Sequence, residues 1–289
     1  MRWVLGLLLS AGWLAAQWCE HGQVAELNSA ADEFAPVWDP AGRQLLLSST
    51  RSGESRIYAV VWHDTSWGSP QELPGLALTG HHLSYAAPSP DGWLYLCRYR
   101  QGRRQAYLHV VRARRSRDSS WEWQELPELH RGAEEAFSAH PTISPDGSML
   151  VFASDRPGGE GGTDLWIAFR QADGHWGEPE NLRSLNSPGN EITPRFASPD
   201  TLYFASDGHG GAGGYDLFVS VRRWDGTWQP PEPLVELNTP MDESDFCSLP
   251  FGELALFVRA RAGERLKLYA ARRCPAASDS PLQSAPPQR

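Results

Sequence analysis

The sequence predicts an all-β protein: a five-bladed β-propeller with four-stranded blades, whose ring is closed by the N-terminal strand. Three features predict it, namely a repeated turn, several short strands in each repeat, and an N-terminal segment that resembles the end of a repeat. A period of about fifty residues with several strands per repeat is typical of a propeller. The repeated turns centre on Pro40, Pro90, Pro145, Pro199 and Pro250, which stand 50, 55, 54 and 51 residues apart.

Each repeat divides into four expected strands. The first two flank the proline turn, as in residues 143–154 (ISPDGSMLVFAS) and 197–206 (ASPDTLYFAS). Short apolar runs bounded by turn residues are typical of strands. The fourth strand opens with a tryptophan after an Asp-Gly turn, as at Trp176 and Trp228, and Asp-Gly favours tight hairpins. The third strands are expected at 57–61, 106–111, 164–169, 216–221 and 266–270.

The two chain ends predict how the ring closes. Trp18 precedes Asn28 by ten residues, which is also the spacing between Trp228 and Asn238. The N-terminal segment therefore resembles a fourth strand that has no earlier strands in front of it. The fifth repeat, in turn, ends near Arg273 without a fourth strand. We expect the N-terminal strand to complete the last blade, so that no open edge remains between the first and last blades.

Two cysteines fall on opposite sides of this junction. Alignment of the fifth repeat with the fourth places Cys274 across the hairpin-like junction from Cys19, within reach of a disulfide. Such a bond is compatible with an exported protein. Cys97 and Cys247 fall in blades two and five, which are not neighbours in a ring of five. We expect both to be buried free thiols.

The N-terminal residues also predict export. Residues 1–16 resemble a secretory signal peptide, with a basic residue before a short apolar run and a small residue before the cut. A lipidated Cys19 is the weaker alternative, because the bulky Trp18 precedes it. No later segment is apolar enough to span a membrane. We expect residues 17–274 to form the propeller, residues 275–289 to be a disordered Pro- and Ser-rich tail, and the protein to be periplasmic or secreted.

Composition and motifs exclude several function classes. The 26 basic and 35 acidic residues give a formal net charge of −9, so a nucleic-acid partner is not expected. The sequence contains no HExxH, CxxC or GxSxG pattern. We therefore expect no metal centre, no cofactor and no nucleophile elbow.

The third and fourth repeats carry a recognisable signature. The segments LVFASDRPGGEGGTDLW with DGHWGEPENLRSLN, and SPDTLYFASDGHGGAGGYDLF with DGTWQPPEPLVELN, resemble the WD40-like propeller repeat of TolB-type cell-envelope proteins. Repeats one and five match in part, and repeat two keeps only its turn and third strand. The resemblance covers about residues 18–273. It implies an exported propeller that acts as an interaction module at the bacterial envelope.

Aspartates bracket the glycine-rich loops of this signature. Carboxylates and exposed carbonyls suit a hard cation such as Ca²⁺, but the resemblance favours a structural role in which the side chains accept backbone N–H groups. Only two repeats have the long loop. The residues are Asp155 and Asp164 in the third repeat and Asp207 and Asp216 in the fourth.

Acidic side chains recur at the expected start of the first strand. Glu33, Glu191 and Glu243 each follow an asparagine by five residues, and His82 and Glu135 occupy this region in repeats two and three. Since first strands line the central channel, we expect a polar ring at one mouth that binds a cation, a basic peptide or a sugar. Two alternatives stay open: the glutamates pair within the hairpins, or they form the carboxylates of a glycosidase.

The second repeat is rich in arginine. Such a cluster suits an anionic glycan, a lipid headgroup or an acidic partner, and the alternative is a solvated hairpin. The candidate partner-binding residues are Arg98, Arg100, Arg103, Arg104, Arg112 and Arg114.

Together these features predict a non-catalytic scaffold, either a monomer or a subunit of an envelope complex. Its expected partner is an envelope protein or a glycan. The alternative is a glycan-active hydrolase that uses carboxylates at the channel mouth.

Overall fold

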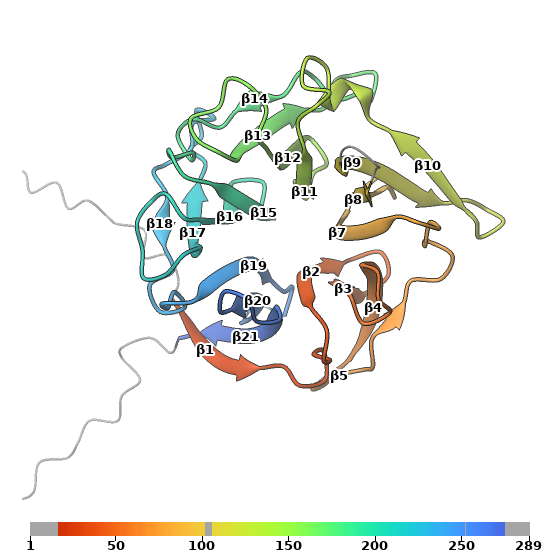
Figure 1. Cartoon of the computed structure of the whole chain (residues 1–289), viewed down its shortest axis with the longest axis vertical. Coiled ribbons are helices and arrows are strands. Elements are labelled where there is room, and N and C mark those ends of the chain that lie inside the picture. Colours follow the sequence, from red (N-terminus) through yellow and green to blue (C-terminus); the bar gives the residue numbers. More distant parts are fainter. Residues whose placement is uncertain (1–16, 102–105, 252, 275–289) are drawn as a thin grey trace, which may run out of the picture.

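The computed structural model describes residues 17–101, 106–251 and 253–274, and it is a ring of five antiparallel sheets around one axis (Figure 1). The predicted all-β, five-bladed propeller is confirmed. The expected leader and tail, residues 1–16 and 275–289, lie outside the described residues. Within the part of the chain that is described, no helix has the length and apolar character needed to cross a membrane.

The first two blades follow the predicted strand order from the axis outward. Blade 1 contains β2 (Glu33–Asp39), β3 (Gln44–Ser49) and β4 (Arg56–His63), and the short strands β5 (Ser66–Trp67) and β6 (Gln71–Glu72) both pair with β4. Blade 2 contains β7 (His82–Pro88), β8 (Leu94–Gln101), β9 (Ala106–Arg115) and β10 (Trp121–Glu125). A 3₁₀ helix, η1 (Pro127–Leu129), leads to the next blade.

Blades 3 and 4 each end in an outer strand of two residues. Blade 3 contains β11 (Ser138–Ile143), β12 (Met149–Ser154), β13 (Asp164–Phe169) and β14 (Glu180–Asn181). Blade 4 contains β15 (Glu191–Ser198), β16 (Thr201–Ser206), β17 (Asp216–Val221) and β18 (Glu232–Pro233).

Blade 5 joins the two ends of the chain. It contains β19 (Asp242–Ser248), β20 (Leu254–Ala260), β21 (Lys267–Arg273) and, as its outer strand, β1 (Trp18–Gln23). Figure 1 shows β1 lying along β21 at the outside of the ring. A disulfide joins Cys19 to Cys274 beside this pairing, and Cys97 and Cys247 are buried and free. The predicted closure, disulfide and free thiols are confirmed.

The turn between the first two strands explains why the Pro-Asp-Gly sequence recurs. In blade 3 the Asp146 carboxylate accepts the Ser148 N–H at 3.1 Å, and Ser144 Oγ accepts the Met149 N–H at 2.9 Å. Gly147 has a φ of 74°, a left-handed conformation that favours glycine. These side-chain bonds set the register with which β11 and β12 leave the turn.

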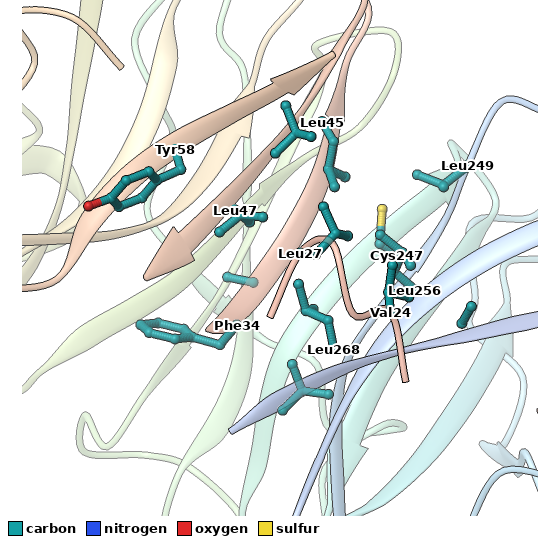
Figure 2. Packing of buried hydrophobic residues seen from close by; sticks show 14 residues of the cluster. Val24, Leu27, Phe34, Leu45, Leu47, Tyr58, Cys247, Leu249, Leu256 and Leu268 are labelled. Carbon is teal, nitrogen blue, oxygen red and sulfur yellow. The ribbon is translucent and has the colours of Figure 1, made fainter. Parts of the chain in front are cut away.

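The hydrophobic core lies between neighbouring blades. Figure 2 shows the cluster between blades 1 and 5, where Phe34 and Leu47 approach Leu256 and Leu268, with Leu27 of the N-terminal segment between them. All five side chains are at most 9% exposed. Burial of a leucine side chain stabilises a fold by about 1.5–3 kcal/mol, so these clusters fix each blade against the next.

Candidate functional site on the propeller axis

The three glutamates predicted at the channel mouth are completely buried. Glu33, Glu191 and Glu243 lie at the start of β2, β15 and β19, and all are 0% exposed. Each carboxylate accepts a hydroxyl hydrogen bond of 2.5 Å from the residue four positions earlier; these donors are Ser29, Ser187 and Thr239. Their present contacts hold the loop that leads into each inner strand, and none of the three is open to a ligand in solution.

A second donor completes the environment of each glutamate. Burial raises the pKa of Glu191 and of Glu243, and the hydroxyl donors oppose this shift. The second partners are Arg51 for Glu33 at 2.7 Å, Ser206 for Glu191 at 2.6 Å, and Arg259 for Glu243 at 2.7 Å. These are the contacts of structural carboxylates.

The asparagine five residues before each glutamate joins one blade to the loop after it. Asn186 Oδ1 accepts the Leu165 N–H at 2.8 Å, and its Nδ2 donates to the Leu165 carbonyl at 3.0 Å. The same exchange occurs between Asn238 and Leu217 and between Asn28 and Leu268. The repeated Asn-to-Glu spacing therefore marks a connection between blades.

The other two residues of the predicted mouth, His82 and Glu135, have different environments from these glutamates. His82 begins β7, and its Nδ1 accepts the Ser55 N–H at 3.1 Å. Glu135 is exposed in the loop before β11. The described hydrogen bonds and ion pairs join none of the five residues to another.

The aspartates of the glycine-rich loops bind backbone and amide groups. Asp164 accepts the Gly161 N–H at 3.1 Å, and Asp216 accepts the Gly213 N–H at 3.2 Å. Asp155 accepts the Phe137 N–H at 2.9 Å, and Asp207 accepts the Asn190 N–H at 2.6 Å. Among the described residues, no group of three or more His, Cys, Asp or Glu side chains is arranged to hold a metal ion.

The arginines of blade 2 divide into buried and exposed members. Arg112 is 7% exposed and lies over the Trp93 ring at 4.4 Å, while Arg100 is exposed. Arg98 and Arg114 form ion pairs with Glu125 and Glu122. Arg98 and Arg100 also line a pocket of about 250 Å³ with two histidines. Arg103 and Arg104 lie outside the described residues.

A larger pocket, called here the axial pocket, lies on the propeller axis. It has a volume of about 450 Å³ and takes residues from the inner strands of all five blades. Exposed prolines of four of the five repeated turns form its rim: Pro40, Pro90, Pro145 and Pro250. Its deeper lining contains Val37, Ala87, Thr142, Arg195 and Cys247, one from each blade. The repeated turn thus builds a pocket as well as a hairpin.

Every inner strand carries a β-bulge two residues before its deep lining residue. The bulged residue has a left-handed φ between 49° and 56° although none is glycine. These residues, called here the bulge ring, are Ala35, Tyr85, His140, Thr193 and Asp245. Left-handed non-glycine residues are strained and cluster at functional sites in proteins.

Contacts between blades link members of the bulge ring. The Tyr85 and His140 rings have centroids 4.1 Å apart. The Thr193 N–H donates to His140 Nδ1 at 3.2 Å, and the Asp245 N–H donates to Thr193 Oγ1 at 3.2 Å. The axis therefore contains a polar chain from blade 2 to blade 5.

Asp245 is the carboxylate of this chain. It is 3% exposed, its Oδ2 accepts the Ser244 hydroxyl at 3.0 Å, and its Oδ1 is buried without a hydrogen-bond partner. Burial raises the pKa of Asp245 to about 6, against the opposing hydrogen bonds from Ser244 and the Ala35 backbone and the charge of Arg195. Burial lowers the pKa of His140 to about 3, so this imidazole is neutral. Asp245 is therefore the group on the axis that exchanges a proton in the mildly acidic range.

An aromatic cluster borders the axial pocket at the junction of blades 1 and 5. Trp38 lines the pocket, and its ring meets exposed Phe251 edge-on with centroids 5.0 Å apart. Trp62 stacks on Phe251 at 5.4 Å and meets Trp67 at 4.5 Å. Flat aromatic faces beside a pocket suit the apolar faces of sugar rings.

The glutamates predicted from the sequence lie at the start of the inner strands, whereas the axial groups Arg195 and Asp245 lie two to four residues after such a glutamate. One signal was present: Arg195 stands in the otherwise uncharged end of β15, TPRFAS. A charged residue inside an inner strand marks a position that faces something other than a hydrophobic core.

Solved structures with this architecture include glycoside hydrolases. A glycoside hydrolase aligns with a TM-score of 0.62 at 10% identity, covering 94% of this chain and 95% of its own. A thermostable family-43 glycoside hydrolase aligns with a TM-score of 0.57 at 11% identity, covering 92% of this chain and 98% of its own. The endo-arabinase from Bacteroides thetaiotaomicron aligns with a TM-score of 0.54 at 13% identity, covering 88% of this chain and 97% of its own.

Other comparisons add little. TolB from Acinetobacter baumannii aligns with a TM-score of 0.47 at 13% identity, covering 85% of this chain and 55% of its own, which is too low to carry an argument. No family model and no curated protein matches the chain.

The glycoside hydrolases correct one expectation. The prediction of a non-catalytic propeller is wrong, because it took a closed five-bladed propeller as evidence against catalysis, and known enzymes use that same fold over their whole length. At 10–13% identity the likeness shows the fold alone. What the axial residues do must be argued from their own chemistry.

Proposed function

We propose that the protein is a glycan-active hydrolase that takes its substrate in the axial pocket. The observation that carries this proposal is Asp245, a buried carboxyl with a pKa of about 6 that stands two residues before the lining residue Cys247 and interacts electrostatically with the lining residue Arg195. A volume of about 450 Å³ lies within the usual range of small-molecule sites, about 300–1,000 Å³. Several solved five-bladed neighbours are named as glycoside hydrolases.

The lining of the pocket suits a sugar. Trp38 offers an aromatic face at the rim, and Ser89, Thr142 and Ser248 offer hydroxyl groups. Sugar rings present apolar faces to aromatic side chains and hydroxyls to polar ones. The pocket supplies both kinds of surface in one concavity.

The proposed chemistry assigns two carboxylates. Asp245 acts as the general acid, because a carboxyl that stays protonated near pH 6 can donate to a departing glycosidic oxygen. Hydrolysis of glycosides generally uses a second carboxylate. We propose Asp39 as the base that takes a proton from the attacking water, since it ends β2 next to the lining residue Trp38 and lines the pocket that adjoins the axial one. Its carboxylate now accepts the Ala41 N–H and the Gln44 amide, both at 3.1 Å.

The test is release of reducing ends from a panel of neutral and acidic polysaccharides. We expect the wild-type protein to cleave at least one of them, and Asp245→Asn and Asp39→Asn to lower kcat by at least a hundredfold. Asp225→Asn is the matched control, since Asp225 lies in an exposed hairpin turn of blade 4. Cleavage that survives both substitutions would overturn the assignment, and no cleavage across the panel would overturn the proposed activity.

Export belongs to the same proposal. A disulfide between Cys19 and Cys274 persists in an oxidising compartment, which supports a periplasmic or secreted location. Fractionation of cells that express the full chain tests this, and recovery of the oxidised protein from the cytoplasm alone would contradict it.

A further inference from the structure

The axial pocket contains a single charged side chain among its described lining residues, the guanidinium of Arg195. The side chain comes from β15, lies 93% buried and reaches the pocket beside Thr142 and Cys247. The other lining residues are apolar, proline or hydroxyl-bearing. The described lining therefore presents one cationic group and no carboxylate, although the whole chain carries a net charge of −9.

Arg195 is poorly paired for a buried cation. Its Nη1 lies 3.5 Å from the Ala86 carbonyl, at the limit of a hydrogen bond, and its Nε is buried without a partner. The described carboxylates form no ion pair with it, although Asp245 is near enough to attract it electrostatically. By contrast, Arg259 binds both Glu20 and Glu243 at 2.7 Å. Arg195 thus lacks the carboxylate partners that Arg259 has.

We infer that the axial pocket binds an acidic glycan, with the carboxylate of a uronic acid unit on Arg195; this inference rests on the proposed function and names its substrate class. A buried guanidinium without a partner is unfavourable, and a carboxylate is its preferred planar partner. The surrounding Trp38 and the hydroxyls of Ser89 and Ser248 bind the sugar ring that carries it.

A second pocket extends the site toward blade 2. It has a volume of about 340 Å³ and shares Pro88 and Ser89 with the axial pocket. Arg115 and Trp121 line it, with the guanidinium 4.8 Å from the ring centre, and the proposed catalytic Asp39 also lines it. Arg115 is exposed, although it also donates to two backbone carbonyls. An arginine on an aromatic face beside the first pocket suits the next acidic unit of a polymer, so the occupant is an oligosaccharide with a charge on successive units.

The test measures binding by isothermal titration calorimetry with three probes of equal length: an oligo-uronate, its neutral counterpart and a sulfated oligosaccharide. The wild-type protein should bind the oligo-uronate at least tenfold more tightly than the neutral probe. Arg195→Met should abolish that preference, and Arg115→Met should weaken it by a few fold. Arg223→Met is the control, because Arg223 lies in the hairpin turn of blade 4, and it should change nothing.

Each contrary outcome has a distinct meaning. Equal binding of the neutral probe, tightest binding of the sulfated probe, or an unchanged preference in Arg195→Met overturns the inference. If Arg195→Met does not fold, Arg115→Met and the loss of wild-type binding at high salt decide the same question. Binding of the oligo-uronate without cleavage keeps the inference and overturns the proposed hydrolysis. Cleavage of neutral glycans alone keeps the proposed hydrolysis and overturns the inference.

Discussion

Cys19 and Cys274 are 255 residues apart in sequence, and their Cα atoms lie 5.2 Å apart, joined by a disulfide. The bond lies where β1 pairs with β21, with Trp18 opposite Arg273 in the register. Nearly the whole propeller is therefore one covalently closed loop. A ring closed in this way keeps the five inner strands at fixed positions around the axis, which the axial pocket requires.

Removal of this disulfide should lower stability without changing the fold. We expect Cys19→Ser/Cys274→Ser to lose about 2–5 kcal/mol of unfolding free energy, because a long loop is no longer restricted in the unfolded chain. Urea unfolding measures the difference. Reductant should destabilise the wild-type protein by the same amount and leave the double variant unaffected. An unchanged midpoint in the variant would mean that strand pairing alone closes the ring.

Glu243 and Arg259 form a buried ion pair, and this predicts a second effect. Glu243→Ala should lower stability by about 1–3 kcal/mol, since it leaves the 5%-exposed guanidinium of Arg259 with Glu20 as its remaining carboxylate. Replacing both residues, as Glu243→Leu/Arg259→Met, should recover most of that loss. A double variant as unstable as the single one would show that loss of the pair itself, and not the poorer pairing of Arg259, determines the effect.

Arg112 and Arg100 lie in the same blade and should respond differently to truncation. Arg112 is buried over Trp93 and donates to Gln124 and to the Tyr95 hydroxyl. We expect Arg112→Ala to lower stability by about 2–3 kcal/mol, and Arg100→Ala to change it by less than about 0.5 kcal/mol. Thermal unfolding of both variants is the measurement. Equal effects would contradict this division of the basic blade.

Asp245 should make stability depend on pH in a specific direction. Its pKa is raised from 3.8 to about 6 by burial, so the unfolded chain ionises first as pH rises. Stability should therefore fall between about pH 4 and 6 and stay reduced above that, by up to about 3 kcal/mol. Asp245→Asn removes this loss, so the variant should be more stable than the wild-type protein at pH 7.5 and show no such gain at pH 3.5.

A stabilising substitution that also abolishes activity would identify a functional residue. A variant that is equally destabilised at both pH values would instead show that the carboxylate at Asp245 is structural. Because the lowered pKa of His140 acts in the opposite direction over part of this range, the difference between variant and wild-type protein is the quantity to compare.

Fold and closure could be predicted from the sequence because local patterns carry them. The proline turns, the Asp-Gly hairpins and the repeated Trp-to-Asn spacing each reflect contacts within one repeat. Five blades, the disulfide and the free thiols follow from counting these repeats. The same repetition predicted a role for the glutamate that follows each asparagine. In the structure this glutamate is buried and links the loop to the inner strand.

The axial site could not be found in the same way. Each bulge adds one residue to the inner strand, so alternation counted from the strand start assigns the wrong face to every later position. The bulge ring also varies in chemistry from blade to blade, from Ala35 to Asp245, and repeat comparison discards such variation as noise. Only the convergence of five strands on one axis brings Asp245 close to Arg195, which lines the axial pocket.

The most direct test of the central claim is a crystal structure of Asp245→Asn soaked with an oligosaccharide that the wild-type protein cleaves. We expect a sugar ring in the axial pocket, against Trp38 and with an anionic group on Arg195. A sugar bound only elsewhere on the propeller, with the axial pocket free of it, would show that the axial pocket is not the substrate site.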